Sequence, residues 1–152
     1  MIRNLAAAVL AVVTVTAAWA ETRTISLAPV PYELQLPEEI ARNLSVEAIS
    51  GDWAKEVERW GGEAASLVYY QPAEGSRSIL MSVYYFPADK FDAAQNPNEP
   101  PSFGREVIRK DGKVLSVAGP QDTIFDAGTV DAKNVVASNA LIYEPENYSP
   151  LE

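Results

Sequence analysis

Cysteine and histidine are both absent from the 152-residue chain. Without histidine, the chain cannot form a Ser-His-Asp triad, a Cys-His dyad or the common zinc sites. Without cysteine, it has no thiol nucleophile, no iron–sulfur ligand and no disulfide. It also lacks G-x-G-x-x-G, Walker and S-x-x-K motifs, so neither nucleotide binding nor serine–lysine catalysis has a signature. What remains is carboxylate catalysis, hard-metal binding or no catalysis, and we expect no cofactor.

Basic residues are also scarce. The 12 Lys and Arg residues are outnumbered by 21 Asp and Glu, which gives a formal net charge of −9 at pH 7. Nucleic acids and anionic lipid surfaces attract clustered basic residues, so this balance disfavours both as partners. We expect a partner protein or a small ligand instead.

The first 20 residues have the layout of a secretory signal. Arg3 is followed by an uncharged apolar run over residues 5–13 and by small residues at Ala18 and Ala20. This pattern predicts a signal peptide cleaved after residue 20, and a periplasmic or secreted protein with no stable membrane anchor. A retained anchor is the alternative, because the run is close to the roughly 20 residues that a membrane span requires.

Residues 21–152 have the size of one domain, and a chain of this length buries about two thirds of the surface it exposes when unfolded. Pro29 and Pro31 interrupt the alternating pattern that begins at Thr24, which predicts an edge segment there. Alternation, helical spacing and turn residues predict the other elements. They are strands over residues 32–36, 45–49 and 123–125, a short helix over residues 37–44 and a helical segment within residues 88–94.

A second helix is predicted over residues 53–60, with Asp52 as its N-cap. Trp53, Val57 and Trp60 are spaced i, i+4 and i+7, so they share one stripe of this helix. Such stripes usually pack in a core, and we expect both tryptophans to lie against a sheet. The alternative is an exposed aromatic face that binds a ligand or a partner.

The string VYY occurs at residues 68–70 and again at residues 83–85. The loop sequence PAEGSRS between the copies predicts an antiparallel hairpin in the middle of the sheet. Successive side chains of a strand point to opposite faces, so the two tyrosines of each copy lie in different layers. Either the rings fill the core, or one layer lines a pocket for a small ligand, with Tyr69 and Tyr84 as the candidate binding residues.

A proline-rich loop over residues 96–103 precedes the clearest turn signal of the chain. Asp111 and Gly112 stand between two strand-like runs and predict a two-residue type I′ hairpin. In that register Lys110 pairs with Lys113.

Four basic residues of this hairpin form the only basic cluster of the chain: Arg105, Arg109, Lys110 and Lys113. Charges on an edge strand commonly discourage unwanted strand pairing. The alternative is a binding surface for an anion or an acidic partner.

The C-terminal segment predicts a helix over residues 132–143, capped by Asp131, with a strand over residues 140–143 as the rival. Asp122, Asp126 and Asp131 suggest a third possible class, a calcium-binding envelope protein. However, the D-x-D-x-D-G loop and its closing glutamate are missing. We therefore name no metal site.

Paired carboxylates could support a hydrolase that acts on an envelope glycan, and this is the alternative function. Glu63, which follows Gly62 and precedes the tyrosine hairpin, is the candidate general acid. No motif marks it, so we assign no catalytic residue.

Consecutive hairpins and segregated helices predict a single α+β domain, with a central antiparallel sheet packed by two or three helices. The segment YELQLPEEI, the Gly61-Gly62 break before AASLVYY, the Asp-Gly hairpin and the terminal helix resemble small exported bacterial proteins. Their order also resembles, more loosely, the α/β/α sandwich of the PsbP family. That resemblance implies an accessory or interaction role and carries over no functional residue. We expect a non-enzymatic binding module that acts through the loop over residues 96–103 or the hairpin over residues 105–113.

Overall fold

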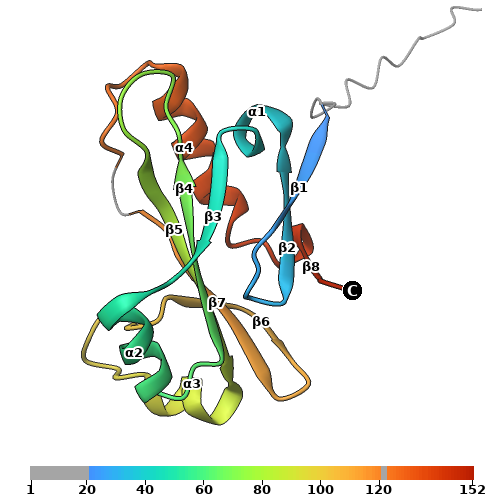
Figure 1. Cartoon of the computed structure of the whole chain (residues 1–152), viewed down its shortest axis with the longest axis vertical. Helices are drawn as coiled ribbons and strands as arrows, with labels where there is room; N and C mark the ends of the chain where they lie inside the picture. The colour runs from blue at the N-terminus through green and yellow to red at the C-terminus, as the bar shows by residue number, and fades with distance from the viewer. Residues whose placement is uncertain (1–20, 121–122) are drawn as a thin grey trace, which may run out of the picture.

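A computed structural model describes residues 21–120 and 123–152, and the predicted signal peptide lies outside this range. The described residues form a single α+β domain with two antiparallel sheets (Figure 1). The three-stranded sheet has the order β1-β2-β8, and the five-stranded sheet has the order β3-β4-β5-β7-β6. The strands are β1 (Thr22–Ser26), β2 (Tyr32–Pro37), β3 (Leu44–Ala48), β4 (Ala64–Tyr70), β5 (Ser78–Pro87), β6 (Arg105–Lys110), β7 (Lys113–Ala118) and β8 (Tyr148–Pro150).

Four α-helices and one 3-10 turn complete the fold: α1 (Glu38–Ala41), α2 (Gly51–Arg59), α3 (Ala88–Ala94), α4 (Val130–Leu141) and η1 (Pro145–Asn147). In Figure 1, α2 and α3 lie at the lower end of the five-stranded sheet, and the three-stranded sheet stands to its right. None of the helices in the described ranges is long and apolar enough to span a membrane.

The two faces of the five-stranded sheet carry separate cores. One core, shared with the three-stranded sheet and α4, includes Leu34, Tyr70, Val83, Leu115 and Ile142. The other, shared with α2 and α3, includes Val57, Tyr84, Phe86, Phe91 and Phe103. The single sheet of the sequence prediction is therefore incomplete, because a second sheet covers one of its faces.

Both predicted hairpins are confirmed. Strands β4 and β5 pair antiparallel in the middle of their sheet, with a register shift between Val68 and Tyr69. In the β6–β7 hairpin, Lys110 pairs with Lys113, as predicted. Asp111 and Gly112 have φ values of 53° and 74°, the left-handed region that a type I′ turn requires.

Both predicted N-caps are wrong. Gly51, with a φ of 67°, already belongs to α2, so Ser50 is the N-cap and Asp52 lies in the first turn. Helix α4 is capped by Thr129, whose Oγ1 accepts a hydrogen bond from the Ala132 N–H at 3.2 Å. The carboxylate of Asp131 is engaged elsewhere, as described below.

The C-terminal region contains two further corrections. Helix α4 forms, so the rival strand over residues 140–143 is wrong, and the short strand β8 follows it and pairs with β2. No strand forms over residues 123–125. There the Phe125 N–H donates to Thr123 Oγ1 within a local turn, and the Phe125 ring packs on Tyr70 with the centroids 5.7 Å apart.

Candidate functional site

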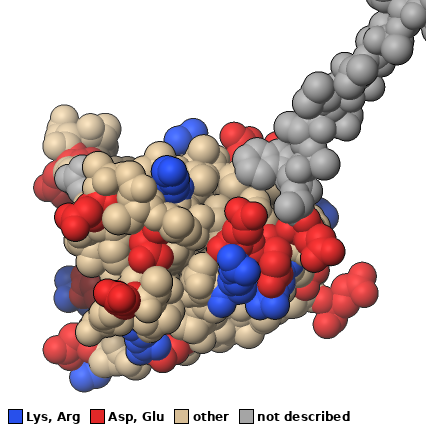
Figure 2. All heavy atoms as spheres, turned by 90° about the horizontal axis from the view of Figure 1, so that it is seen from above, with Lys and Arg blue, Asp and Glu red and all other residues tan. Residues whose placement is uncertain are grey.

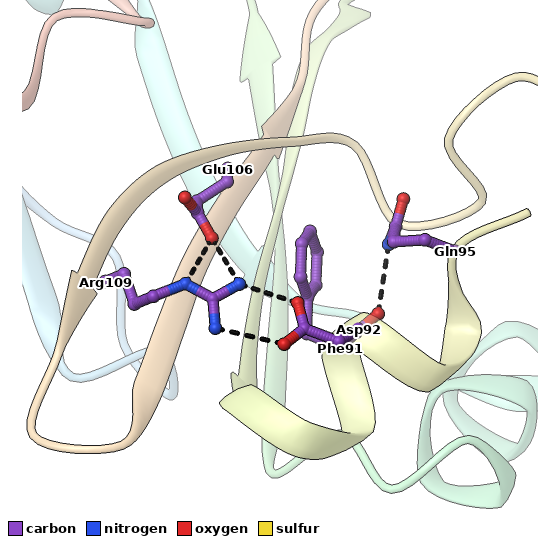
Figure 3. Close-up of polar contacts among 5 residues, drawn as sticks. All are labelled: Phe91, Asp92, Gln95, Glu106 and Arg109. Atoms are coloured by element: carbon purple, nitrogen blue, oxygen red, sulfur yellow. Dashed lines mark hydrogen bonds and ion pairs between the residues drawn. The ribbon is translucent and has the colours of Figure 1, made fainter. Parts of the chain in front are cut away.

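Arg109 of the predicted basic cluster joins the hairpin to α3 (Figure 3). Its guanidinium donates to both carboxylate oxygens of Asp92, at 2.6 and 3.2 Å, and its Nε donates to Glu106 at 2.7 Å. These two carboxylates raise the pKa of Arg109 above its ordinary value, and Arg109 lowers the pKa of Asp92. Arg109 therefore anchors the edge strand to a helix and has little capacity left for a ligand.

The other three cluster residues do not form one surface with Arg109. Arg109 pairs with Val114 in the β6–β7 ladder, so it shares the sheet face of α2 and α3. Arg105 lies 5.2 Å from the ring of Tyr143, and Lys113 forms an ion pair with Glu63. Within residues 21–120 and 123–152, Lys110 takes part in no ion pair.

The two candidate tyrosines share one face of the sheet, as the alternation predicts. Tyr84 is buried in the core on the side of α2 and α3. Tyr69 packs against the same core and is covered by the Arg77 guanidinium, 3.8 Å from its ring centroid. Neither ring lines the two hollows described below.

The partner tyrosines, Tyr70 and Tyr85, face the other core. The Tyr70 hydroxyl donates to Asp131 Oδ1 at 2.8 Å and accepts from Asn134 Nδ2 at 3.0 Å. The second oxygen of Asp131 accepts from the Ala73 N–H at 3.3 Å. This network fixes the start of α4 to the β4–β5 hairpin, which is a structural role. Tyr85 lies beside a hollow instead.

The tryptophan stripe of α2 corrects the expectation that both rings pack against the sheet. Trp53 and Trp60 are 40% and 42% exposed, whereas Val57 is 4% exposed. At 100° per residue, the indoles lie about 40° and 60° around the helix axis from Val57. Val57 and Phe86 approach Gly62 too closely for any side chain there. Because this contact is centred on Val57, and both tryptophans are displaced to the same side of it, the larger indoles are left at one margin of the packed face.

The proline-rich loop lies beside α2 (Figure 1). Its last residue, Phe103, is buried, and its ring centroid is 5.4 Å from that of Tyr84. Burial raises the pKa of Tyr84, and hydrogen bonds to Ser82 and Trp53 act in the opposite direction. Trp53, Tyr84 and Phe103 thus connect α2 to the loop. Residues 96–102 of the loop are all exposed.

The larger hollow, of about 380 Å³, lies between α2, the start of β4 and the β1–β2 turn. Ala54, Val57 and Ile49 form its apolar part, and its carboxylates are Glu58 and Glu63. The Glu63 carboxylate is 42% exposed and paired with the Lys113 ammonium. A carboxylic general acid typically stands in an apolar pocket, whereas this carboxylate is exposed and engaged by a lysine. The hydrolase hypothesis stays a prediction that this geometry does not strengthen.

The calcium hypothesis gains no support from geometry. Among the residues that the structure describes, no group of three or more acidic side chains is arranged to hold a metal ion. Asp122, one of the three residues on which the hypothesis depends, lies outside these residues.

No family model, no curated protein and no solved structure matches this chain. The resemblance to the PsbP family therefore stays a prediction, and the functional argument below depends on the geometry of the chain itself.

Proposed function

We propose that this protein is an exported, non-enzymatic binding module that engages a partner protein through the α2 surface. This surface consists of Trp53, Trp60 and the loop over residues 96–102. The observation that carries the proposal is the exposure of two tryptophans on one side of a single helix. Tryptophan is enriched at the energetic centres of protein interfaces, because it covers a large area with few rotatable bonds.

The exposed parts of the two indoles can supply substantial binding energy. A tryptophan side chain buries about 150–250 Å² in a complex or core. With about 40% still exposed, each ring offers roughly 60–100 Å², which corresponds to about 1.5–2.5 kcal/mol at 25 cal/mol per Å². The seven-residue spacing separates the two rings by about 10 Å along the helix.

The shape of the surface favours a protein over a small molecule. Neither indole lines either of the two hollows described, so neither helps to enclose a small ligand there. A partner with an apolar cleft about 10 Å long can receive both rings. Figure 2 shows the molecule from above the view of Figure 1, the end opposite α2, and on that face the described Lys and Arg side chains stand apart or beside acidic ones.

The experiment places a photo-crosslinking amino acid at position 60 in producing cells, identifies the crosslinked protein and titrates it in purified form. We expect Trp53→Ala and Trp60→Ala each to weaken binding about 10- to 60-fold, which is the affinity equivalent of the lost contact area. Val136→Ala is the matched control, because Val136 is 64% exposed on α4 and lies outside the α2 surface.

Circular dichroism melts of each variant separate loss of binding from loss of folding. Unchanged affinity of the folded double variant would show that the partner binds elsewhere. The absence of any crosslink at position 60, with crosslinks at position 136, would also count against the α2 surface.

A further inference from the structure

A second hollow lies where the tip of the β6–β7 hairpin meets β2 and the C-terminal strand. Its volume is about 210 Å³, and its walls include Pro31, Tyr32, Tyr85 and Pro150. Tyr32 pairs with Pro150 in the β2–β8 ladder, and the Leu151 N–H donates to the Pro31 carbonyl at 3.1 Å. These backbone contacts fix the walls, so the hollow is a built part of the fold.

The hollow presents two phenol hydroxyls. The rings of Tyr32 and Tyr85 are 6.1 Å apart between centroids and inclined at 59°. Neither hydroxyl has a hydrogen-bond partner among the described residues. Every fully buried side-chain oxygen or nitrogen of these residues does have a partner, so the two hydroxyl oxygens are not fully buried. The two hydroxyls therefore reach solvent and can bind a ligand. Burial raises the pKa of Tyr32, with Tyr85 and Asp111 acting in the same direction, so this phenol stays a neutral donor at neutral pH.

Two opposite charges lie at the rim of the same hollow. Lys110 ends β6, and Asp111 is the first residue of the type I′ turn. Both line the hollow, and neither takes part in an ion pair in the described part of the chain. This arrangement differs from that of Lys113 and Arg109, whose charges are already matched by carboxylates.

We infer that this hollow binds a small zwitterion, namely an α-amino acid with an aliphatic side chain. The ligand carboxylate contacts the Lys110 ammonium and its ammonium contacts the Asp111 carboxylate, while the phenol hydroxyls hydrogen-bond to the ligand. The side chain lies against the tyrosine rings and the prolines. A ligand with only a negative charge would leave the Asp111 carboxylate without a partner and repel it. A ligand with only a positive charge would do the same to the Lys110 ammonium.

The size of the hollow limits the ligand further. Pockets for drug-sized ligands occupy about 300–1,000 Å³, and this hollow is smaller. Its location is also separate from the α2 surface. Tyr85 packs against the core on the other face of the five-stranded sheet from Tyr84 and α2, so this inference does not depend on the proposed function.

The test is a titration of isotope-labelled residues 21–152 with L-leucine, followed by backbone and tyrosine chemical shifts. Two probes each lack one charge of leucine: leucine methyl ester lacks the carboxylate, and 4-methylpentanoate lacks the ammonium. We expect leucine to shift the signals of Tyr32, Tyr85, Lys110 and Asp111. Each one-charge probe should bind about fivefold more weakly, since exposed charge contacts are individually modest.

Variants assign each charge. Lys110→Met should weaken leucine binding about fivefold and leave the affinity of the methyl ester unchanged. Asp111→Asn should weaken leucine binding and spare 4-methylpentanoate, and asparagine tolerates the left-handed φ of this turn position. Lys133→Met is the matched control, because Lys133 is an exposed lysine on α4 that lies outside the hollow.

Three outcomes would overturn the inference. One is the absence of leucine-dependent shifts at the hollow, and another is equal affinity for leucine and both one-charge probes. The third is the same affinity for leucine in Lys110→Met and Asp111→Asn as in the unaltered chain. Because Tyr85→Phe keeps the ring and removes the hydroxyl, it serves as a further variant should Asp111→Asn disturb the turn.

Discussion

The exposure of the α2 tryptophans can be measured without any knowledge of a partner. The chain has three tryptophans, and Trp19 precedes the described residues. The tryptophan fluorescence of a protein comprising residues 21–152, excited selectively over its tyrosines, therefore comes from Trp53 and Trp60 alone. The perturbation is the addition of acrylamide, a neutral collisional quencher that reaches only the exposed part of an indole.

The structure sets the expected magnitude. The exposed fractions are 40% for Trp53 and 42% for Trp60, so each ring should be quenched with roughly two fifths of the efficiency of a free indole. The single-tryptophan variants Trp53→Phe and Trp60→Phe separate the two contributions, which should be nearly equal. In concentrated urea, both variants should approach the efficiency of a free indole.

Strong protection would refute this reasoning. If both indoles were quenched with less than a tenth of the free efficiency, they would be packed in the core, as the helical spacing alone predicts. The α2 surface would then lose its aromatic centre, and with it the proposed function. A difference between the two variants, with only one ring protected, would contradict the position of Val57 at the centre of the packed face.

Three further predictions concern stability. Gly104→Ala should strongly lower the free energy of unfolding, because a Cβ there would lie 2.5 Å from the backbone of Val117. Gly75→Ala is the comparison, because a Cβ there meets open space and only the positive φ should cost about 1 kcal/mol. Urea titrations measure both variants. Tyr70→Phe removes two hydrogen bonds and should cost about 1–3 kcal/mol in the same assay, and an unchanged midpoint would show that the network contributes nothing. Burial raises the pKa of Tyr70 and Tyr84 above 10.0, so the folded state favours the neutral phenols. Their contribution to the free energy of unfolding is therefore complete below pH 10 and is lost as the pH rises above it. A free energy of unfolding that rises from pH 9 to pH 11 would contradict this.

Short-range rules were sufficient where a turn or an alternation fixes the geometry. The Asp-Gly pair predicted the register of the β6–β7 hairpin, because both residues tolerate the positive φ of a type I′ turn. Alternation likewise predicted that Tyr69 and Tyr70 face different cores.

The same rules failed where several segments compete for one partner. Asp131 and Thr129 both qualify as N-caps of α4, and the structure uses Thr129 because Asp131 bonds to the Tyr70 hydroxyl, 61 residues away in the chain. Strand β8 has only three residues, so it has no detectable pattern of its own, and its pairing with β2 defines it.

The candidate sites show the same division. The four basic hairpin residues were identified from the sequence, but the structure assigns Arg109 and Lys113 to ion pairs with acidic residues of other segments. The hollow beside Lys110 could not be predicted, because its walls come from β2, β5, the hairpin turn and the C-terminus. Tyr32 and Tyr85 are 53 positions apart, and only the packing of the two sheets brings their rings together.

By itself, the sequence determined the absence of thiol and imidazole chemistry, the α+β class, the central hairpin and the type I′ turn. These properties depend on composition or on residues close together in the chain, where backbone sterics act directly. Only the tertiary structure decided the second sheet, the rotation of α2 that exposes the tryptophans and the hollow at the hairpin tip. Each of these depends on which distant surfaces pack together, and burial of apolar area is not directional enough for a local pattern to specify it.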